Sequence, residues 1–229
     1  MSSRMDSSRF KWLVATAAAI ALIGGYFAFF SGANDAAMLE RGNRDQRLAA
    51  IQSLETKATA GAAETLAKYI TDSDIEVARR VLIALGRMKT AAPIDLIKPA
   101  LNDERPEIRE AAVAAIGLRG LEGDPATLRQ LLKSDPSVNV RLSAAGALGS
   151  MRDWDAMESF AEALNYPDET FQLVAAEQML RIAGLYHQGF RPNASPQDRR
   201  SGINFLKTNW RYFKGTHEQY LRDKEIQRR

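Results

Sequence analysis

The sequence predicts an all-α protein. Its body is expected to be an α-solenoid of about four to five helical hairpins, with one N-terminal transmembrane helix and a helical C-terminal cap. Three observations predict this architecture. An uncharged apolar run lies near the N-terminus, a helical pattern recurs through the middle, and the chain becomes basic and aromatic after Gly184.

The composition bounds the class of protein. The chain has 229 residues, of which 45% are hydrophobic and 26% charged, so it can bury a substantial core. It contains no cysteine, which excludes disulfides and thiolate metal sites. The net charge of +3 is unevenly placed, because residues 40–184 are slightly acidic whereas residues 185–229 are basic.

The N-terminal apolar run, residues 13–30, reads LVATAAAIALIGGYFAFF and has no charged side chain. As a helix it spans roughly 27 Å, close to the thickness of a bilayer core. Arg4, Arg9 and Lys11 precede it, and Trp12 lies at its start, where interfacial aromatic residues are common. These features predict a single-pass anchor in a bacterial inner membrane, with a cytoplasmic N-terminus and a periplasmic repeat domain.

A cleaved signal peptide is the alternative, with Ser31-Gly32-Ala33 as a small-residue cleavage site. The run is longer than the usual signal core, which favours the anchor, and both interpretations stay open. Small residues recur three and four apart along one face of this helix, and they define a candidate packing face for another membrane helix: Ala18, Ala21, Gly25 and Ala28. Such residues are also common in any membrane helix.

An internal repeat organises the middle of the chain, with a period of about 31 residues. The stretches RLAAIQSLE, ARRVLIALG, REAAVAAIG and RLSAAGALG begin at Arg47, Ala78, Arg109 and Arg141, and QLVAAEQML from Gln172 is a weaker fifth. One aligned column contains Leu54, Leu85, Ile116, Leu148 and Met179, and a second contains Ala50, Val81, Ala112, Ala144 and Ala175. The spacing of apolar residues within each stretch predicts a helix with one apolar face.

A second helix is expected in each of the first four units, in TLAKYI, LIKPAL, LRQLLK and FAEALN. Its two apolar columns are Leu66, Ile97, Leu128, Phe160, and Ile70, Leu101, Leu132, Leu164. Asp124-Pro125 predicts a helix start, and Gly86, Gly117 and Gly149 are expected where first helices end. Two short helices cannot bury their apolar faces alone, so neighbouring pairs are expected to stack.

The stretches LNDERPEIREAAVAAIGLRG and LKSDPSVNVRLSAAGALGSM resemble HEAT-like repeats of the phycobilisome-lyase type. Both place an acidic, proline-bearing turn before an arginine and an alanine-rich helix that ends in Leu/Ile-Gly. The resemblance covers roughly residues 45–184. It implies a HEAT-like solenoid and a scaffold or binding module. No pigment site is apparent, so lyase activity is not carried over.

The domains expected along the chain are therefore a basic N-terminus 1–11, an anchor 12–30, a linker 31–44, a solenoid 45–184 and a C-terminal cap and arm 185–229. In the tail, Ser195-Pro196 predicts the start of a helix whose apolar face carries Ile203, Leu206, Trp210 and Phe213. This helix is expected to cover the last repeat. A separate short helix is expected from Thr216.

The tail also carries a candidate surface for contact with a partner protein or with lipid headgroups, formed by Arg199, Arg200, Lys207, Trp210, Arg211 and Lys214. The predicted anchor disfavours nucleic acid as its ligand. A solvated helix face is the plainer alternative.

No pattern of catalytic or cofactor-binding residues is found. The sequence has no glycine-rich phosphate loop and no nucleophile elbow, and its two histidines, His187 and His217, lack a second ligand at metal spacing. Asp72, Asp103 and Asp135 recur at repeat boundaries, which favours capping over acid–base chemistry. We therefore expect no enzyme, no cofactor, no metal and no small-molecule substrate.

The leading functional interpretation is a non-catalytic scaffold. It would be a structural or accessory subunit of a larger inner-membrane complex, respiratory or photosynthetic, that binds neighbouring proteins. One alternative is a transient assembly factor or adaptor. Another is a lyase-like protein that acts on a cofactor-bearing partner.

Overall fold

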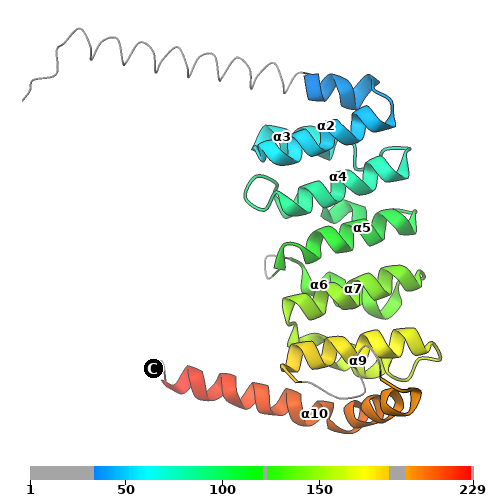
Figure 1. Cartoon of the computed structure of the whole chain (residues 1–229). Coiled ribbons are helices and arrows are strands. Elements are labelled where there is room, and N and C mark those ends of the chain that lie inside the picture. Colours follow the sequence, from blue (N-terminus) through cyan, green and yellow to red (C-terminus); the bar gives the residue numbers. More distant parts are fainter. Residues whose placement is uncertain (1–33, 121–122, 186–193, 228–229) are drawn as a thin grey trace, which may run out of the picture.

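A computed structural model describes residues 34–120, 123–185 and 194–227. All regular structure in these residues is helical, and no strand occurs among them. Consecutive helical pairs lie one above the other in chain order, so the body is an elongated stack (Figure 1). The predicted all-helical, solenoid-like repeat fold is confirmed.

The first helix of each unit is regular. These helices are α2 (Arg44–Lys57), α4 (Ile75–Arg87), α5 (Pro106–Gly117), α7 (Val138–Met151) and α9 (Glu169–Ala183). Each of the first four packs on the first helix of the next unit. The two aligned apolar columns are the reason, because every member of both columns is at most 3% exposed.

The second helices are shorter and less regular. They are α3 (Ala60–Ala67), the 3-10 segments η1 (Ile94–Leu96) and η2 (Lys98–Asn102), α6 (Pro125–Ser134), and η4 (Trp154–Ala156) with α8 (Met157–Ala163). Their predicted columns are also buried, since the most exposed member, Ile70, is 8% exposed. In the second unit Pro99 lacks a backbone N–H, and the expected helix is replaced by 3-10 turns.

The glycines at the ends of the repeat motif have a different role from the expected one. Gly86 and Gly149 lie inside α4 and α7, and Gly117 is the last residue of α5. A Cβ at Gly86 would lie 2.7 Å from the Cα of Ala115, and one at Gly117 would lie 3.0 Å from the Cβ of Ala147. These glycines therefore permit close approach of successive first helices rather than ending them.

The segment expected to be a linker is partly helical. Residues 34–41 form a helix, and Leu39 within it is fully buried. Asp35 accepts hydrogen bonds from Ser53 and Lys57 of α2, at 2.8 and 2.5 Å. This helix covers the first repeat, as a terminal unit of a solenoid must.

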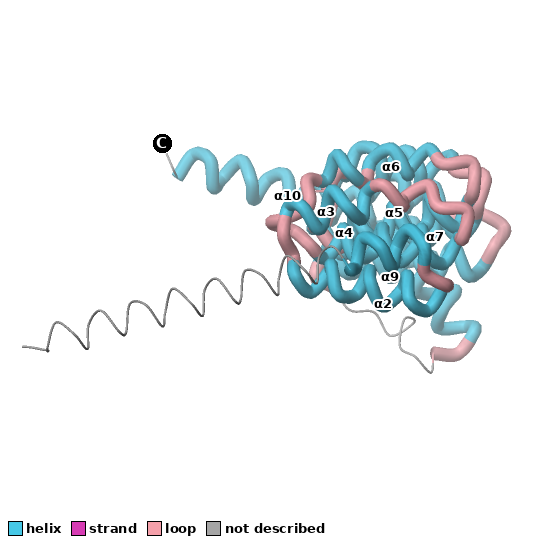
Figure 2. Tube along the Cα trace, turned by 90° about the horizontal axis from the view of Figure 1, so that it is seen from above, coloured by secondary structure: helices cyan, strands magenta, loops and turns pink. Residues whose placement is uncertain are grey.

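The C-terminal helix α10 (Pro196–Gln227) is one continuous helix of 32 residues. The separate helix expected from Thr216 is not formed, because Gly215 is accommodated within α10. The first part of α10 packs on α8 and α9, and its C-terminal part extends beyond the stack (Figures 1 and 2).

The predicted membrane localisation is corrected. No helix in residues 34–120, 123–185 or 194–227 is both long and apolar enough to cross a bilayer. The anchor 12–30, and with it the packing face of Ala18, Ala21, Gly25 and Ala28, lies outside the described residues.

Candidate functional site

A ladder of aspartate–arginine contacts fixes the turns that precede α4, α5 and α7. In each turn an aspartate accepts the backbone N–H two residues ahead, at 2.8 Å for Asp72, 2.9 Å for Asp103 and 2.8 Å for Asp135. Each carboxylate also binds an arginine, and the ion pairs are Arg47–Asp72, Arg105–Asp103 and Arg109–Asp135. The predicted capping role is wrong for these three residues, because α4, α5 and α7 begin after Asp74, Arg105 and Ser137; the three aspartates instead fix the turns that lead into the helices.

The ladder also links one unit to the next. Arg105 donates to the carbonyl of Asp72 at 2.7 Å, and Arg109 of α5 donates to the carboxylate of Asp135, in the turn before α7, at 2.8 and 2.9 Å. The hydrogen bond from Arg105 holds the pKa of Asp103 below its usual value. Burial acts to raise the pKa of Asp135, but the hydrogen bonds from Arg109 and Ser137 outweigh it and leave that pKa lowered.

The N-terminal part of α10, which we call its base, is fixed in place by its N-terminal cap and by its apolar face. Ser195 accepts the N–H of Asp198 at 3.1 Å and donates its hydroxyl to the Asp198 carboxylate at 2.8 Å. Ile203 and Leu206 are 4% and 0% exposed, and Trp210 and Phe213 pack at the edge of the same core. The predicted apolar face of this helix is therefore confirmed.

Opposite this base, α8 presents two carboxylates to solvent. Met157 and Phe160 point into the core and are fully buried, so Glu158 and Glu162 lie on the outer side of the helix. The two glutamates are one helical turn apart, as are Lys207 and Arg211 on α10.

A cleft of about 380 Å³ separates these two rows of charge, and we call it the α8–α10 cleft. Its lining residues are Glu158, Ala161, Glu162, Asn165, Lys207, Trp210 and Arg211. Among the described residues, Glu158 and Lys207 make no ion pair, while Glu162 pairs with Lys133 at 3.1 Å, outside the cleft lining. Arg211 lies over the ring of Trp210, 5.0 Å from its centroid. Glu158 and Lys207 are therefore available to a ligand, while Glu162 is shared with Lys133.

The structure brings together only part of the predicted tail surface. Lys207, Trp210 and Arg211 line the cleft. Arg199 instead lies 3.6 Å from Glu169 and donates to the carbonyl of Ala194. Arg200 is exposed and Lys214 is half-buried, and neither lines the cleft.

Sequence analysis missed the acidic wall formed by Glu158 and Glu162, together with Asn165. Their spacing on one face of the FAEALN helix, away from Phe160, was visible in the sequence. The partner wall was not, because it comes from a helix that begins more than thirty residues later.

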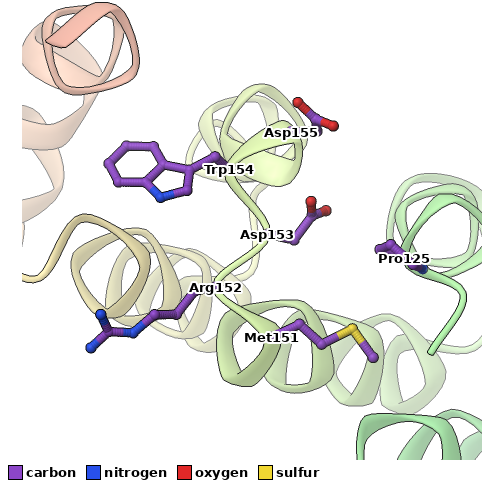
Figure 3. Close-up of a pocket in the computed structure, with 6 residues that line it drawn as sticks. All are labelled: Pro125, Met151, Arg152, Asp153, Trp154 and Asp155. Atoms are coloured by element: carbon purple, nitrogen blue, oxygen red, sulfur yellow. The ribbon is translucent and has the colours of Figure 1, made fainter. Parts of the chain in front are cut away.

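A smaller cavity of about 160 Å³ lies where α7 turns into η4 (Figure 3). Pro125, Met151, Arg152, Asp153, Trp154 and Asp155 line it. Arg129 binds Asp153 at 2.7 Å and lies 3.5 Å from Asp155. Figure 3 shows the indole of Trp154 directed away from Pro125. Because its carboxylates are already neutralised by Arg129, this cavity is a weaker candidate than the α8–α10 cleft.

Within the described part of the chain, no group of three or more His, Cys, Asp or Glu side chains is arranged to hold a metal ion. His217 is half-buried against Trp154, and His187 lies outside the described residues.

Comparison with known proteins supports the repeat assignment. The family model described as HEAT repeats matches residues 36–117 and 63–135. A deoxyhypusine hydroxylase from Arabidopsis thaliana is 31% identical over 116 residues, which are 50% of this chain and 37% of the hydroxylase. The chain thus spans little more than a third of that relative.

Solved structures with similar folds have low sequence identity. The complex of CpcE and CpcF of phycocyanin lyase from Nostoc sp. PCC7120 is 24% identical, with a TM-score of 0.39 over 78% of this chain and 67% of that one. A designed armadillo repeat protein in complex with the peptide (KR)4 is 16% identical, with a TM-score of 0.47 over 76% of this chain and 98% of that one.

The relative also corrects one prediction. The chain was expected not to be an enzyme, yet the curated relative that matches half of it is named as an enzyme, a hydroxylase. HEAT repeats of this kind therefore do not exclude catalysis.

Proposed function

We propose that this chain is a repeat scaffold that binds a protein partner in the α8–α10 cleft. One observation carries the proposal: the carboxylates of Glu158 and Glu162 face the cations of Lys207 and Arg211 across an open cleft, without ion pairs between them. A single chain that needed these charges only for its own stability would gain by closing them on one another.

The chemistry of the cleft favours a partner that carries both signs of charge. A purely anionic ligand would meet the two glutamates, and a purely cationic one would meet Lys207 and Arg211. A protein segment with acidic and basic side chains satisfies both walls, and Trp210 supplies apolar contact area of the kind that anchors interfaces. The volume of about 380 Å³ suits a few side chains.

The rest of the fold supports this role. Burial of Ile203 and Leu206 holds α10 against α8 and α9, so the two walls of the cleft are in place before a partner arrives. Preorganisation of this kind reduces the entropy lost on binding. Membership of a larger assembly and transient binding as an assembly factor or adaptor are both compatible with the cleft.

Site-specific photo-crosslinking tests the proposal. A photoreactive residue replaces Asn165 at the cleft or Lys89 at the turn after α4, which is exposed and serves as the control. We expect one defined protein to be captured in cells from position 165 and not from position 89. Glu158→Lys and Trp210→Ala should each reduce that adduct by about tenfold, the effect of losing one interface anchor. Equal capture from both positions contradicts the proposal.

The hydroxylase relative favours a second candidate, in which the bound partner is a protein held for an enzymatic modification. Mass spectrometry of the captured partner distinguishes it. This candidate requires the partner to carry a covalent modification that is lost in cells that produce Glu158→Lys, whereas plain scaffolding leaves the partner chemically unchanged.

A further inference from the structure

The part of α10 that extends beyond the repeats has an unusually apolar surface for an exposed helix. Tyr220, Leu221 and Ile226 are 51%, 51% and 71% exposed. We call residues 218–227 the arm. In monomeric proteins large exposed apolar side chains gathered on one element mark an interaction surface.

A stripe of alternating charge runs along α10 from the cleft to the arm. Positions three or four apart share one face of a helix, and here they are Lys207, Arg211, Lys214, Glu218, Leu221 and Glu225. The half nearest the repeats is cationic, and the half on the arm is acidic with a leucine between the two glutamates. Arg222 lies beside the stripe and is bonded to Gln219 at 3.0 Å.

Two copies of this stripe have complementary charges when the two helices run in opposite directions. If two copies of α10 lie antiparallel and cross at Thr216, Lys207 meets Glu225 of the partner subunit and Lys214 meets Glu218 of the partner subunit. Arg211 then lies beside Leu221 of the partner subunit. A parallel arrangement in register would place like charges opposite one another, which is destabilising. Each pair occurs twice in the antiparallel arrangement, as in any two-fold interface.

The position of the repeats permits this arrangement. The body covers α10 only at its base, where Ile203 and Leu206 are buried, and leaves the arm uncovered. Antiparallel pairing therefore sets the arm of one subunit beside the base of the other, with the two bodies toward opposite ends of the pair.

We propose that two copies of this chain form an antiparallel dimer through α10, with the arm of each copy lying along the α8–α10 cleft of the other. The inference rests on the proposed function, because it names a second copy as an occupant of the same cleft. The arm carries the chemistry that the cleft requires on the face of the stripe: Glu218 and Glu225 are acidic, and Arg222 beside them is basic.

A charge-reversal cycle tests this dimer. Lys207 and Glu225 are separated by about 27 Å along one helix, at 1.5 Å per residue. They cannot contact each other within one subunit, so any coupling between their substitutions arises between subunits. Sedimentation velocity of the purified 229-residue chain, of 25.3 kDa, is measured for wild type, Lys207→Glu, Glu225→Lys and the double variant. Lys89→Glu is the matched control, and circular dichroism checks that every variant is folded.

We expect wild type, Lys89→Glu and the double variant to dimerise with similar Kd values. Each single reversal should raise the Kd by tenfold or more, because it places two like-charged pairs in the interface. Any association through the N-terminal apolar run is common to all the variants and cancels in the comparison. The inference is overturned if the single reversals leave the Kd unchanged, or if the double reversal does not restore it.

The outcomes also separate this inference from the proposed function. Capture of a different protein from position 165, with a self-association unchanged by the reversals, rejects the dimer and keeps the protein-binding cleft. Loss of dimer in the single variants, restoration in the double variant and capture only of this chain from position 165 identify the second copy as the partner.

Discussion

The imidazole of His217 lies parallel to the indole of Trp154, with 4.0 Å between the ring centroids and 5° between the ring planes. Trp154 opens η4 in the fourth repeat, and His217 lies on α10 at the start of the part that leaves the body. The stack therefore ties α10 to a unit other than the one it caps, and it sets where the arm begins.

Removal of this stack is expected to loosen α10. His217→Ala should lower the local stability of the helix by about 1 kcal/mol, the usual worth of a stacked pair of rings. Hydrogen exchange of the amides in residues 210–220 measures this stability, and Gln219→Ala is the control. A double-mutant cycle with Trp154→Ala should recover a coupling of similar size, and strictly additive effects would show that the stack contributes nothing.

The ion pair between Arg109 and Asp135 is expected to be the most sensitive contact in the ladder. Arg109 donates to both oxygens of Asp135 at 2.8 and 2.9 Å, and the two side chains are only 11% and 2% exposed. Asp135→Ala leaves a buried guanidinium without its partner and should lower the free energy of unfolding by about 3 kcal/mol. Urea denaturation measures the loss.

Asp155→Ala is the matched control for that prediction. The Asp155 side chain is 75% exposed and lies 3.5 Å from Arg129, so its removal should cost at most about 0.5 kcal/mol. Similar losses for the two variants would mean that burial does not set the strength of these pairs.

The aspartate–arginine ladder also predicts that the folded protein loses stability at acidic pH. The pKa values of Asp103 and Asp135 are lowered in the folded state, so the unfolded chain binds protons more readily at these positions. Their contribution to stability is complete above the ordinary aspartate pKa of about 3.9, and it is lost as the pH falls below that value. Thermal unfolding between pH 6 and about pH 3 should show a falling Tm, and Asp135→Asn should flatten that dependence. An unchanged slope in Asp135→Asn contradicts the prediction.

The sequence could predict the repeats because their buried residues recur at fixed positions. Leu85 and Ile116 occupy equivalent sites in α4 and α5, and the same packing requirement selects a large apolar side chain at both. Local exceptions were harder to predict. LIKPAL keeps Ile97 and Leu101 buried as expected, but Pro99 changes the helix type without changing which residues face the core.

Only one of the two walls of the α8–α10 cleft was predicted from the sequence. Lys207, Trp210 and Arg211 were recognised from the composition of the tail, while Glu158 and Glu162 were not. The two walls meet because α10 packs on α8 and α9, and neither α8 nor α10 carries a local sequence signal for that packing. The Trp154–His217 stack was missed for the same reason.

At Gly86 the helices of two successive repeats approach closely, backbone to backbone, and this predicts effects of opposite sign at two glycines. A Cβ at Gly86 would lie 2.7 Å from the Cα and 2.8 Å from the carbonyl oxygen of Ala115. Both atoms belong to the backbone of α5 and cannot move aside alone. Gly86→Ala should therefore push α4 and α5 apart and lower the free energy of unfolding by about 2 kcal/mol.

Gly146 lies in the middle of α7, where an added Cβ would meet no atom within 4 Å. Gly146→Ala therefore adds no clash and restricts the unfolded chain, so it should raise the free energy of unfolding by up to about 1 kcal/mol. Urea denaturation of the two variants measures both effects under the same conditions. If both substitutions shift stability in the same direction, close approach of α4 to α5 is not what requires glycine at position 86.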